Sequence, residues 1–260
     1  MPYIELDNTD GERLFYALHR SRKTTAQIVY VHGAGGSHLN WPAEMRRLPG
    51  ASVYALDLPG HGRSTGTGRR TIGEYVAVLV SFLDTLGLAD AVIVGHSMGG
   101  AVALETALSH PERIRGLVLI GSGARLRVAP AILQGIQEDF EGTVKLFGEW
   151  VYGPDVPDDL KRQGQQLMAE TSPKVMYGDF LACDAFDVMA RLGEIHTPTL
   201  AITGTLDRLT PVKYATFVTQ NIPGAQLVLV ENAGHMVMVE RPRKVSEAVA
   251  RFVTFLTATE

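Results

Sequence analysis

One stretch of the chain has the residue types needed for nucleophilic chemistry. Gly95-His96-Ser97-Met98-Gly99 follows a short β-branched run, residues 92–94, and leads into a good helix former, residues 102–108. A strand that turns directly into a helix forces the middle residue into a strained conformation and projects its side chain above the sheet. An ordinary glycine-rich turn is the alternative interpretation. The strand–turn–helix context instead favours Ser97 as a nucleophile.

A serine nucleophile needs a base within hydrogen-bond reach, and the base needs an orienting partner. The carboxyl ends of parallel strands meet at one edge of a sheet, so both groups are expected in loops that follow strands. Asp207 follows the apolar run 199–204, and His235 follows the run 226–230. The chain order serine, aspartate, histidine is the order expected of the architecture that contains this kind of turn. We therefore predict Ser97, Asp207 and His235 as the catalytic residues.

Each of the two partners also has a simpler interpretation. Asp207 could be an acid at the start of the next helix, but it precedes that helix by about four residues, which is far for a cap. His235 could be a surface histidine, since the chain has eight histidines. A carboxylate after the run 114–120 would compete with Asp207, but glycine and serine occupy residues 121–123. The combination with Ser97 therefore favours the catalytic interpretation.

Backbone donors are needed for the negative charge that develops on a carbonyl oxygen during attack. The N–H of Met98 lies at the start of the helix that follows Ser97. A second donor is expected in the loop His32-Gly33-Ala34-Gly35-Gly36, where small residues let a substrate approach the backbone. We predict the N–H of Ala34 for this role, with Gly33 and Gly35 as alternatives.

Two other polar residues near the predicted site have structural roles as their simplest interpretation. Asp57 precedes a loop, residues 58–64, that is rich in proline and glycine. We expect Asp57 to fix this loop through its own hydrogen bonds rather than to act on a substrate. His96 is expected to orient the turn that carries Ser97.

Apolar runs that alternate with helical patterns indicate βαβ units and a parallel sheet covered on both faces, which is an α/β fold. Turn-forming residues 8–11 suggest a hairpin at the start of the chain, and Pro242 suits a first helical position. The predicted strands are 13–19, 26–31, 52–57, 92–95, 114–120, 199–204 and 226–230, and the predicted helices are 39–48, 72–86, 102–108, 211–221 and one that begins at 242.

The alternation stops between residues 124 and 193, where helical pieces surround one loop. Such a segment is too long for a connection, since most loops run about 4–6 residues. We expect residues 124–193 to form a helical cap over the catalytic edge of a core made of residues 1–123 and 194–260. Its apolar side chains favour an apolar acyl or alkyl group. The expected lining is drawn from Phe140, Phe147, Trp150, Tyr152, Met176 and Phe180, with Met98 and Met236 on the floor and Gly33 and Gly35 beside the oxyanion.

Composition narrows the class of protein further. The 260 residues are 45% apolar and 20% charged, with a net charge of −4, so no basic field attracts nucleic acid or anionic lipid. Cys183 is the single cysteine, expected to pack as a small buried residue. No basic-then-apolar leader and no run of about 18 apolar residues is present, so we expect a cytoplasmic protein without membrane insertion. Monomer and homodimer both remain open.

Together these motifs resemble the α/β-hydrolase fold superfamily, and within it the small bacterial carboxylesterases and monoacylglycerol-lipase-like hydrolases. The resemblance implies an eight-stranded, mostly parallel sheet with a helical cap between the sixth and seventh strands. It implies Ser97 as nucleophile, His235 as base and Asp207 as its partner, and no metal or organic cofactor. The motifs that carry it are His32-Gly33-x-Gly35, Asp57-x-Pro59-Gly60-His61-Gly62-x-Ser64, Gly95-His96-Ser97-Met98-Gly99-Gly100, Gly204-x-x-Asp207 and Ala233-Gly234-His235.

The expected activity is hydrolysis of a small, largely apolar carboxylic ester through an acyl-enzyme intermediate. Haloalkane dehalogenases and epoxide hydrolases need an aspartate in place of Ser97, so these classes are excluded. Hydrolysis of a carbon–carbon bond, a lactone or a thioester, and cofactor-free perhydrolase chemistry, use the same three residues and stay open. A small-molecule receptor is the non-enzymatic alternative, which the intact set of catalytic residues disfavours.

Overall fold

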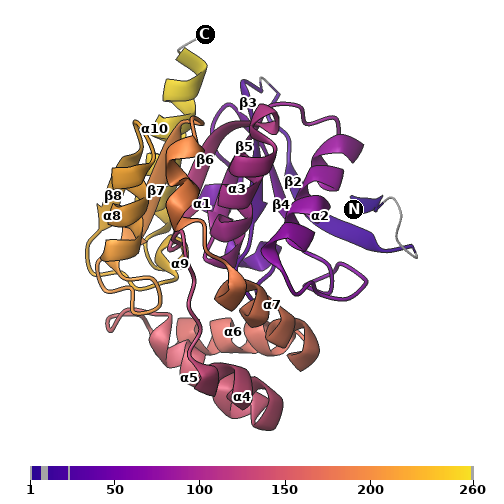
Figure 1. Ribbon diagram of the computed structural model, residues 1–260, viewed down its shortest axis with the longest axis vertical. Coiled ribbons are helices and arrows are strands. Elements are labelled where there is room, and N and C mark those ends of the chain that lie inside the picture. Colours follow the sequence, from indigo (N-terminus) through magenta and orange to yellow (C-terminus); the bar gives the residue numbers. More distant parts are fainter. Residues whose placement is uncertain (1, 7–10, 23, 259–260) are drawn as a thin grey trace.

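The computed structural model describes residues 2–6, 11–22 and 24–258. Within these ranges, eight strands form one sheet in the order β1-β2-β4-β3-β5-β6-β7-β8 (Figure 1). The strand β2 pairs antiparallel with β1 and β4, and the strands from β4 to β8 pair in parallel. The strands are β1 (Tyr3–Glu5), β2 (Arg13–His19), β3 (Ala26–Val31), β4 (Ala51–Leu56), β5 (Ala91–His96), β6 (Ile114–Ile120), β7 (Thr199–Gly204) and β8 (Gln226–Val230).

Helices cover both faces of this sheet and its carboxyl edge. The helices of the core are α1 (Ala43–Arg46), α2 (Ile72–Thr85), α3 (Met98–Ser109), α8 (Val212–Asn221), α9 (Val237–Glu240) and α10 (Pro242–Ala258), and those of the cap are α4 (Pro130–Glu138), α5 (Phe140–Trp150), α6 (Asp158–Ala169) and α7 (Pro173–Ala185). Short 3-10 helices are η1 (His38–Asn40), η2 (Pro111–Arg113) and η3 (Met189–Glu194). No helix in the described ranges is long and apolar enough to cross a membrane.

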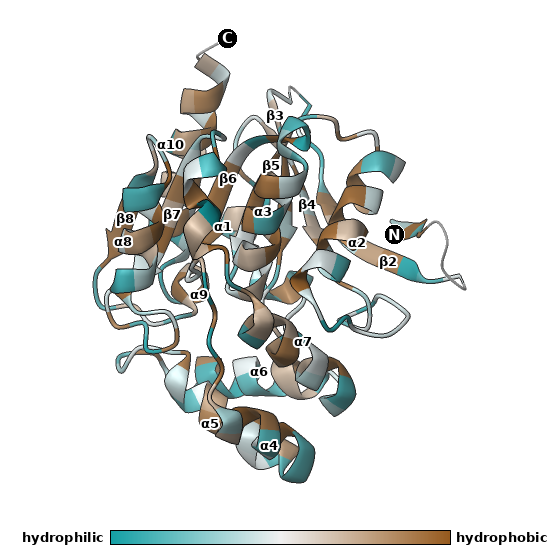
Figure 2. Ribbon diagram, in the orientation of Figure 1, coloured by the Kyte–Doolittle hydropathy of each residue, from teal (hydrophilic) through white to brown (hydrophobic). Residues whose placement is uncertain are grey.

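The period-2 alternation of the strands divides the core into two layers. In β3, Val29 and Val31 belong to the buried cluster that contains α2 and α3. Ile28 and Tyr30 face the opposite side, in the cluster that contains α1 and α10. Because both faces are covered, the central strands are continuously apolar, as Figure 2 shows by their brown colour.

Most predicted elements of the core are confirmed. The predicted strands 13–19, 26–31, 114–120, 199–204 and 226–230 match β2, β3, β6, β7 and β8, and α10 begins at Pro242 as expected. β1 and β2 pair as the predicted hairpin requires, but residues 7–10 of its turn lie outside the described residues.

The helix predicted over residues 39–48 is wrong. The segment instead forms η1 and the four-residue α1, separated by Trp41 and Pro42. Proline has no N–H for an intrahelical hydrogen bond, and it disfavours helical conformation in the residue before it. Trp41, at φ −100 and ψ 109, is extended accordingly. Pro42 therefore begins a new helix rather than continuing the old one.

The cap leaves the core after β6 and returns to it before β7. At this neck Val188 donates its N–H to the carbonyl of Ala124 at 2.8 Å, and Arg125 pairs with Asp187 both as a β-bridge and as an ion pair. The cap helices α4–α7 lie below the carboxyl ends of the strands in Figure 1. The segment between β6 and β7 is thus helical and lies over the edge of the sheet at which Ser97 precedes α3.

Candidate active site

Ser97 has the strained backbone that the sequence predicts. Its φ of 51° and ψ of −115° lie in a region that non-glycine residues rarely adopt. Its N–H donates to the carbonyl of Ile120 at 3.0 Å, which holds the turn against β6. The flanking glycines are sterically required, because a Cβ on Gly95 would lie 2.1 Å from the carbonyl oxygen of Gly99, and a Cβ on Gly99 would lie 2.1 Å from that of Val31.

Asp207 and His235 form a buried hydrogen-bonded pair. Nδ1 of His235 lies 2.9 Å from Oδ2 of Asp207. The other oxygen, Oδ1, accepts the N–H groups of Leu209 at 2.9 Å and Thr210 at 2.8 Å, and the Thr210 hydroxyl donates to Oδ2 at 2.8 Å. Burial opposes charge on Asp207, but His235 and these donors outweigh it and hold the pKa of the carboxyl below its usual value.

The Asp207 contacts fix the histidine ring so that its second nitrogen is available. Nδ1 faces the carboxylate, so the proton resides there and Nε2 carries the lone pair. Nε2 of His235 and Oγ of Ser97 have no hydrogen-bond partner among the described residues, and in this conformation they are not bonded to each other. Both residues line the same cavity. In enzymes without substrate, such a contact is commonly long and tightens when substrate binds.

The structure distinguishes between the three oxyanion donors predicted in the loop 32–36, which are the N–H groups of Gly33, Ala34 and Gly35. The N–H of Gly35 is already used, because it donates to Oδ2 of Asp179 at 2.9 Å. The N–H groups of Gly33, Ala34 and Met98 have no partner among the described residues. Met98 is the first residue of α3, where the N–H groups of a helix are unpaired. The geometry thus leaves the N–H groups of Gly33, Ala34 and Met98 available and removes Gly35 as a donor.

His96, which precedes Ser97, forms a hydrogen bond to the loop that carries His235. Its Nε2 lies 3.2 Å from the carbonyl oxygen of His235, and the two rings are 4.8 Å apart between centroids. Burial, with a smaller contribution from the nearby His235, lowers the pKa of His96 to about 3. His96 is therefore neutral and donates this hydrogen bond to the segment that carries His235.

Glu240, which the sequence analysis missed, holds the same segment from the other side. Its carboxylate accepts the N–H of Gly234 at 3.0 Å and that of Gly153 at 3.2 Å. Gly234 precedes His235, and Gly153 belongs to the cap. Burial raises the pKa of Glu240 above its usual value. No local motif identifies this role, because Gly153 and Glu240 are 87 positions apart.

Asp57 has the structural role that the sequence predicts. Its carboxylate accepts the N–H of Arg63 at 2.9 Å, and its own carbonyl accepts the Ser64 hydroxyl at 2.6 Å. It also accepts the N–H of His38 at 2.5 Å and pairs with Nδ1 of that ring at 2.9 Å. Asp57 thus fixes the loop that follows β4.

Two cavities meet at Ser97 beneath the cap. The first, of about 80 Å³, contains the loop 33–36 and His235, and the second, of about 220 Å³, extends past Trp150 and Tyr214. Both are bordered by Phe147 and Phe180, whose rings stack at 5.0 Å. The residues common to both cavities are Ser97, Phe147, Phe180, Cys183 and Leu209.

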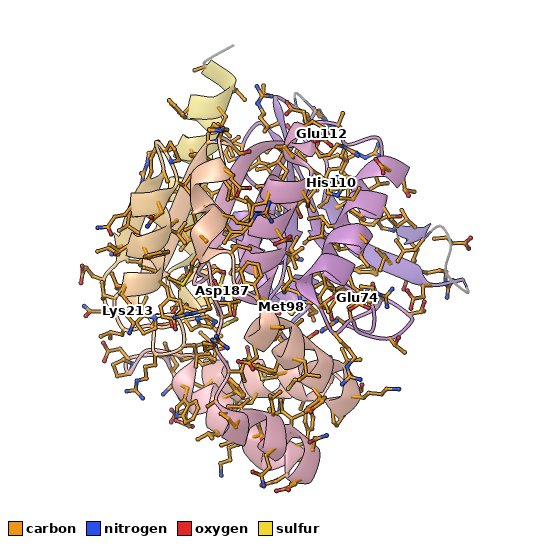
Figure 3. All side chains as sticks on the ribbon, in the orientation of Figure 1. Glu74, Met98, His110, Glu112, Asp187 and Lys213 are labelled. Atoms are coloured by element: carbon orange, nitrogen blue, oxygen red, sulfur yellow. The ribbon has the colours of Figure 1, made fainter. Side chains whose placement is uncertain are left out.

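The expected pocket residues divide into those that line a cavity and those that do not. The first group consists of Gly33, Gly35, Phe147, Tyr152, Phe180 and Met236 in the first cavity and Phe147, Trp150 and Phe180 in the second. Phe140 lines neither cavity and packs, partly buried, against the core cluster. Met98 and Met176 also line neither, because both side chains are fully buried. Figure 3 labels Met98 where the core meets the cap.

Further lining residues were not anticipated. In the first cavity Asn40, Gln165 and Met168 contribute, and in the second Arg127 and Arg208 contribute. Gln165 and Met168 lie on α6, which Figure 2 shows as largely hydrophilic, so hydropathy gave no signal for Gln165, whereas Met168 is one of the few apolar residues of this helix. Cys183 is buried as expected and also borders both cavities.

The chain is similar to known hydrolases. Residues 28–248 match the family described as the alpha/beta hydrolase family. A pimeloyl-[acyl-carrier protein] methyl ester esterase from Yersinia enterocolitica is 30% identical over 86% of this chain and 92% of its own length. A 2-hydroxy-6-oxononadienedioate/2-hydroxy-6-oxononatrienedioate hydrolase from Burkholderia vietnamiensis is also 30% identical, over 94% and 92%. The solved structure of a thermophilic esterase is similar with a TM-score of 0.85 and 33% identity, over 98% of this chain and 97% of that one.

Proposed function

Given that this chain belongs to the alpha/beta hydrolase family, we propose that it hydrolyses carboxylic esters with Ser97 as the nucleophile. One observation carries the proposal. The Asp207–His235 pair presents an unbonded Nε2 to the same cavity into which the turn at Ser97 opens. A base oriented by a carboxylate beside a serine on a strained turn is the arrangement that serine acyl transfer requires.

In the proposed reaction His235 removes the proton from Ser97 as Oγ attacks the ester carbonyl carbon. The carbonyl oxygen becomes an oxyanion, which accepts the N–H groups of Ala34 and Met98. His235 then gives its proton to the departing alkoxide, which leaves as the alcohol and an acyl-serine remains. A water molecule, deprotonated by His235, attacks the acyl carbon. His235 then returns this proton to Oγ of Ser97 as the acid leaves. Asp207 remains ionised and stabilises the imidazolium.

The cavity lining supports a small, largely apolar substrate. Most side chains that border both cavities are apolar, and Phe147 and Phe180 line the same two cavities as Ser97. Such a surface contributes burial and few polar contacts, so it favours an apolar acyl or alkyl group over a sugar. The esterases among the relatives support the ester bond as the target.

Carbon–carbon bond hydrolysis is the second candidate. The Burkholderia hydrolase named for a dienedioate has the same sequence identity to this chain, 30%, as the Yersinia esterase. The same serine, histidine and aspartate serve both reactions. Turnover of nitrophenyl esters, lactones, thioesters and vinylogous 1,5-diketones in one panel separates these candidates, and we expect the esters to be hydrolysed fastest.

A serine-directed fluorophosphonate tests the nucleophile. We expect it to label Ser97 alone, and Ser97→Ala to lower kcat by about 10⁴-fold or more. Ser109→Ala is the matched control, because Ser109 is exposed at the far end of the same helix. Its labelling and kcat should equal those of the wild type. A labelled peptide elsewhere in the chain, or wild-type activity in Ser97→Ala, would refute the proposed function.

A further inference from the structure

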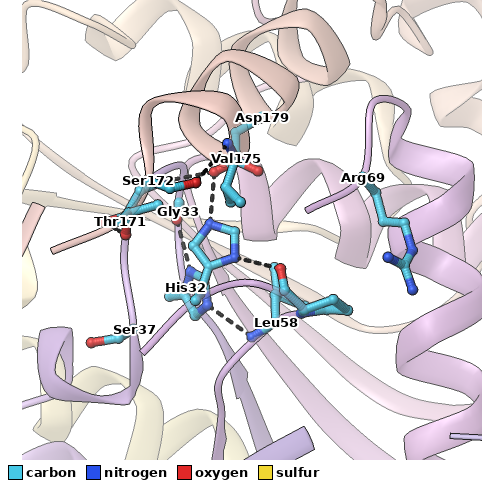
Figure 4. Close-up of polar contacts among 12 residues, drawn as sticks. His32, Gly33, Ser37, Leu58, Arg69, Thr171, Ser172, Val175 and Asp179 are labelled. Carbon is cyan, nitrogen blue, oxygen red and sulfur yellow. Dashed lines mark hydrogen bonds and ion pairs between the residues drawn. The ribbon is translucent and has the colours of Figure 1, made fainter. Parts of the chain in front are cut away.

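A fully buried cap carboxylate, Asp179 on α7, contacts the loop that carries the proposed oxyanion donor. Its Oδ2 accepts the N–H of Gly35 at 2.9 Å and lies 2.8 Å from Nε2 of His61. Its Oδ1 accepts the hydroxyl of Tyr75. Figure 4 shows Asp179 on the side of the cap helix and His32 on the side of the core. One cap side chain therefore joins α2, the loop after β4 and the loop after β3.

The protonation of His61 follows from its two partners. Nδ1 lies 3.0 Å from the carbonyl oxygen of Pro59, and Nε2 faces Asp179. Both partners are acceptors, so both ring nitrogens are donors and the ring is an imidazolium. Burial opposes this charge, but Asp179 more than offsets it and raises the pKa of His61. Asp179 and His61 thus form a buried ion pair, and the Gly35 N–H shares its acceptor oxygen.

The cap holds Gly35 on both sides. Besides the bond to Asp179, its carbonyl accepts the hydroxyl of Thr171 at 3.2 Å, and Thr171 lies between α6 and α7. Gly35 has a φ of 63°, and a Cβ there would lie 2.7 Å from Cε of Met176. The positive φ at this position favours glycine, and a side chain there would displace the end of Met176.

The core holds the preceding peptide. The carbonyl of Gly33, which shares a peptide plane with the N–H of Ala34, lies 2.8 Å from Nδ1 of His32 and accepts the N–H of Gly36 at 3.0 Å. His32 is a fixed neutral tautomer, because its Nε2 accepts the N–H of Leu58 at 3.0 Å. Ala34 is therefore bracketed by one peptide plane that the core anchors and one that the cap anchors.

We infer that Asp179 is a positioning residue for ester hydrolysis: by anchoring the Ala34–Gly35 peptide it fixes the direction of the Ala34 N–H toward the oxyanion. This inference rests on the proposed function. Core and cap then hold the two peptides on either side of Ala34, and unseating the cap helix α7 frees one of them. Asp179 touches no reacting atom and acts through the loop.

Asp179→Asn tests this role, because it removes the charge that holds His61 and Gly35 while preserving the volume. A misaligned oxyanion donor raises the barrier for attack but leaves binding of the ground state unchanged. We expect kcat on a nitrophenyl ester to fall about 10- to 100-fold with KM within about threefold. Affinity for a trifluoromethyl ketone, whose adduct with Ser97 carries the oxyanion, should fall by the same factor as kcat/KM.

Asp184→Asn is the matched control for cap docking. Asp184 lies on the same helix and its Oδ1 accepts the N–H of Val128 at 3.0 Å, but it does not contact the loop 32–36. We expect it to keep kcat and ketone affinity within about twofold of wild type. Equal losses in both aspartate variants would reduce Asp179 to a general cap contact and overturn the inference.

Thr171→Val is a second variant that keeps every charge and removes only the contact to the Gly35 carbonyl. We expect a loss in kcat of about 3- to 10-fold with unchanged KM. If a thermal melt shows that Asp179→Asn is not folded, Thr171→Val takes its place as the test. Wild-type kcat in a folded Asp179→Asn variant overturns the inference and leaves the proposed function intact. If Asp179→Asn does not fold, wild-type kcat in Thr171→Val has the same consequence. A wild-type protein without esterase turnover overturns both.

Discussion

Two buried histidine–aspartate pairs lie on either side of the candidate site and look alike by distance. His235 is 2.9 Å from Asp207, and His61 is 2.8 Å from Asp179. All four side chains are nearly inaccessible to solvent. The pairs differ in what the second ring nitrogen does. Nε2 of His235 has no partner among the described residues and faces the cavity, whereas Nδ1 of His61 is bound to the Pro59 carbonyl.

A short histidine–carboxylate contact therefore does not by itself mark a catalytic pair. A base must hold a lone pair that a substrate or nucleophile can reach. Both ring nitrogens of His61 donate to acceptors, so this ring is a fixed cation. Only one ring nitrogen of His235 is hydrogen-bonded, so the other is able to take and return a proton. The same two residue types thus supply chemistry in one loop and rigidity in another.

Asp207→Asn should break the catalytic pair with the largest effect. The amide that this substitution introduces donates as well as accepts, so the neutral ring of His235 can turn its lone pair toward it and lose the tautomer that accepts the Ser97 proton. We expect normal folding and a loss in kcat of about 10³- to 10⁴-fold. Steady-state kinetics and a thermal melt check both statements.

Asp57→Asn provides the matched control for this comparison, because Asp57 also pairs with a buried histidine, His38, and neither of the two lines a cavity at Ser97. It should lower the melting temperature while kcat stays within about tenfold of wild type. Near-normal kcat in Asp207→Asn would instead indicate that a different carboxylate orients His235.

The fold and the edge of the sheet that carries the candidate catalytic residues followed from local patterns. Buried parallel strands are short β-branched runs, so β3, β6, β7 and β8 could be bounded from sequence. Since such strands end at one edge, residues far apart in the chain could be placed together there. The turn at Ser97 was predictable for the same local reason. The helix expected over residues 39–48 failed because Pro42 outweighed the apolar pattern.

The cap shows where local patterns stop being informative. Its aromatic residues could be counted but not oriented, so Phe140 was grouped with Phe147 although only the latter lines a cavity. Asp179 gave no signal, because its bond to Gly35 spans 144 positions. Glu240 was missed for the same reason. The polar contacts that seat the cap are tertiary, and no spacing rule encodes them.

The His61–Asp179 pair should make the free energy of unfolding depend on pH. The folded pKa of His61 is raised above its ordinary value of 6.5. Its contribution to the free energy of unfolding is therefore complete below pH 6.5 and is lost as the pH rises through the folded pKa. The titratable groups that face it are Asp179, Asp57 and His32, and burial lowers the pKa of His32 to about 4, so His32 stays neutral over this range.

The measurement is the difference in melting temperature between wild type and His61→Gln across about pH 5.5 to 9. We expect a difference of several degrees at the acidic end that shrinks as the pH rises. His19→Gln is the control, because His19 lies at the end of β2, is only partly buried and forms no ion pair with any of the described residues. A difference that stays constant with pH would mean that His61 does not carry the charge we assign to it.

The smallest expected effect concerns the acyl chain, and it separates the two phenylalanines of the cap. Each methylene that the cavities enclose should contribute about 0.8 kcal/mol, or about fourfold in kcat/KM. On nitrophenyl esters kcat/KM should rise from acetate to a maximum at a short-to-medium chain and then fall. Phe147→Leu, which enlarges both cavities, should move this maximum to a longer chain, whereas Phe140→Leu should leave it in place. A profile that is flat, or highest for a charged acyl group, would contradict the apolar substrate. Equal shifts in both variants would show that the cavity walls are not what sets the chain length.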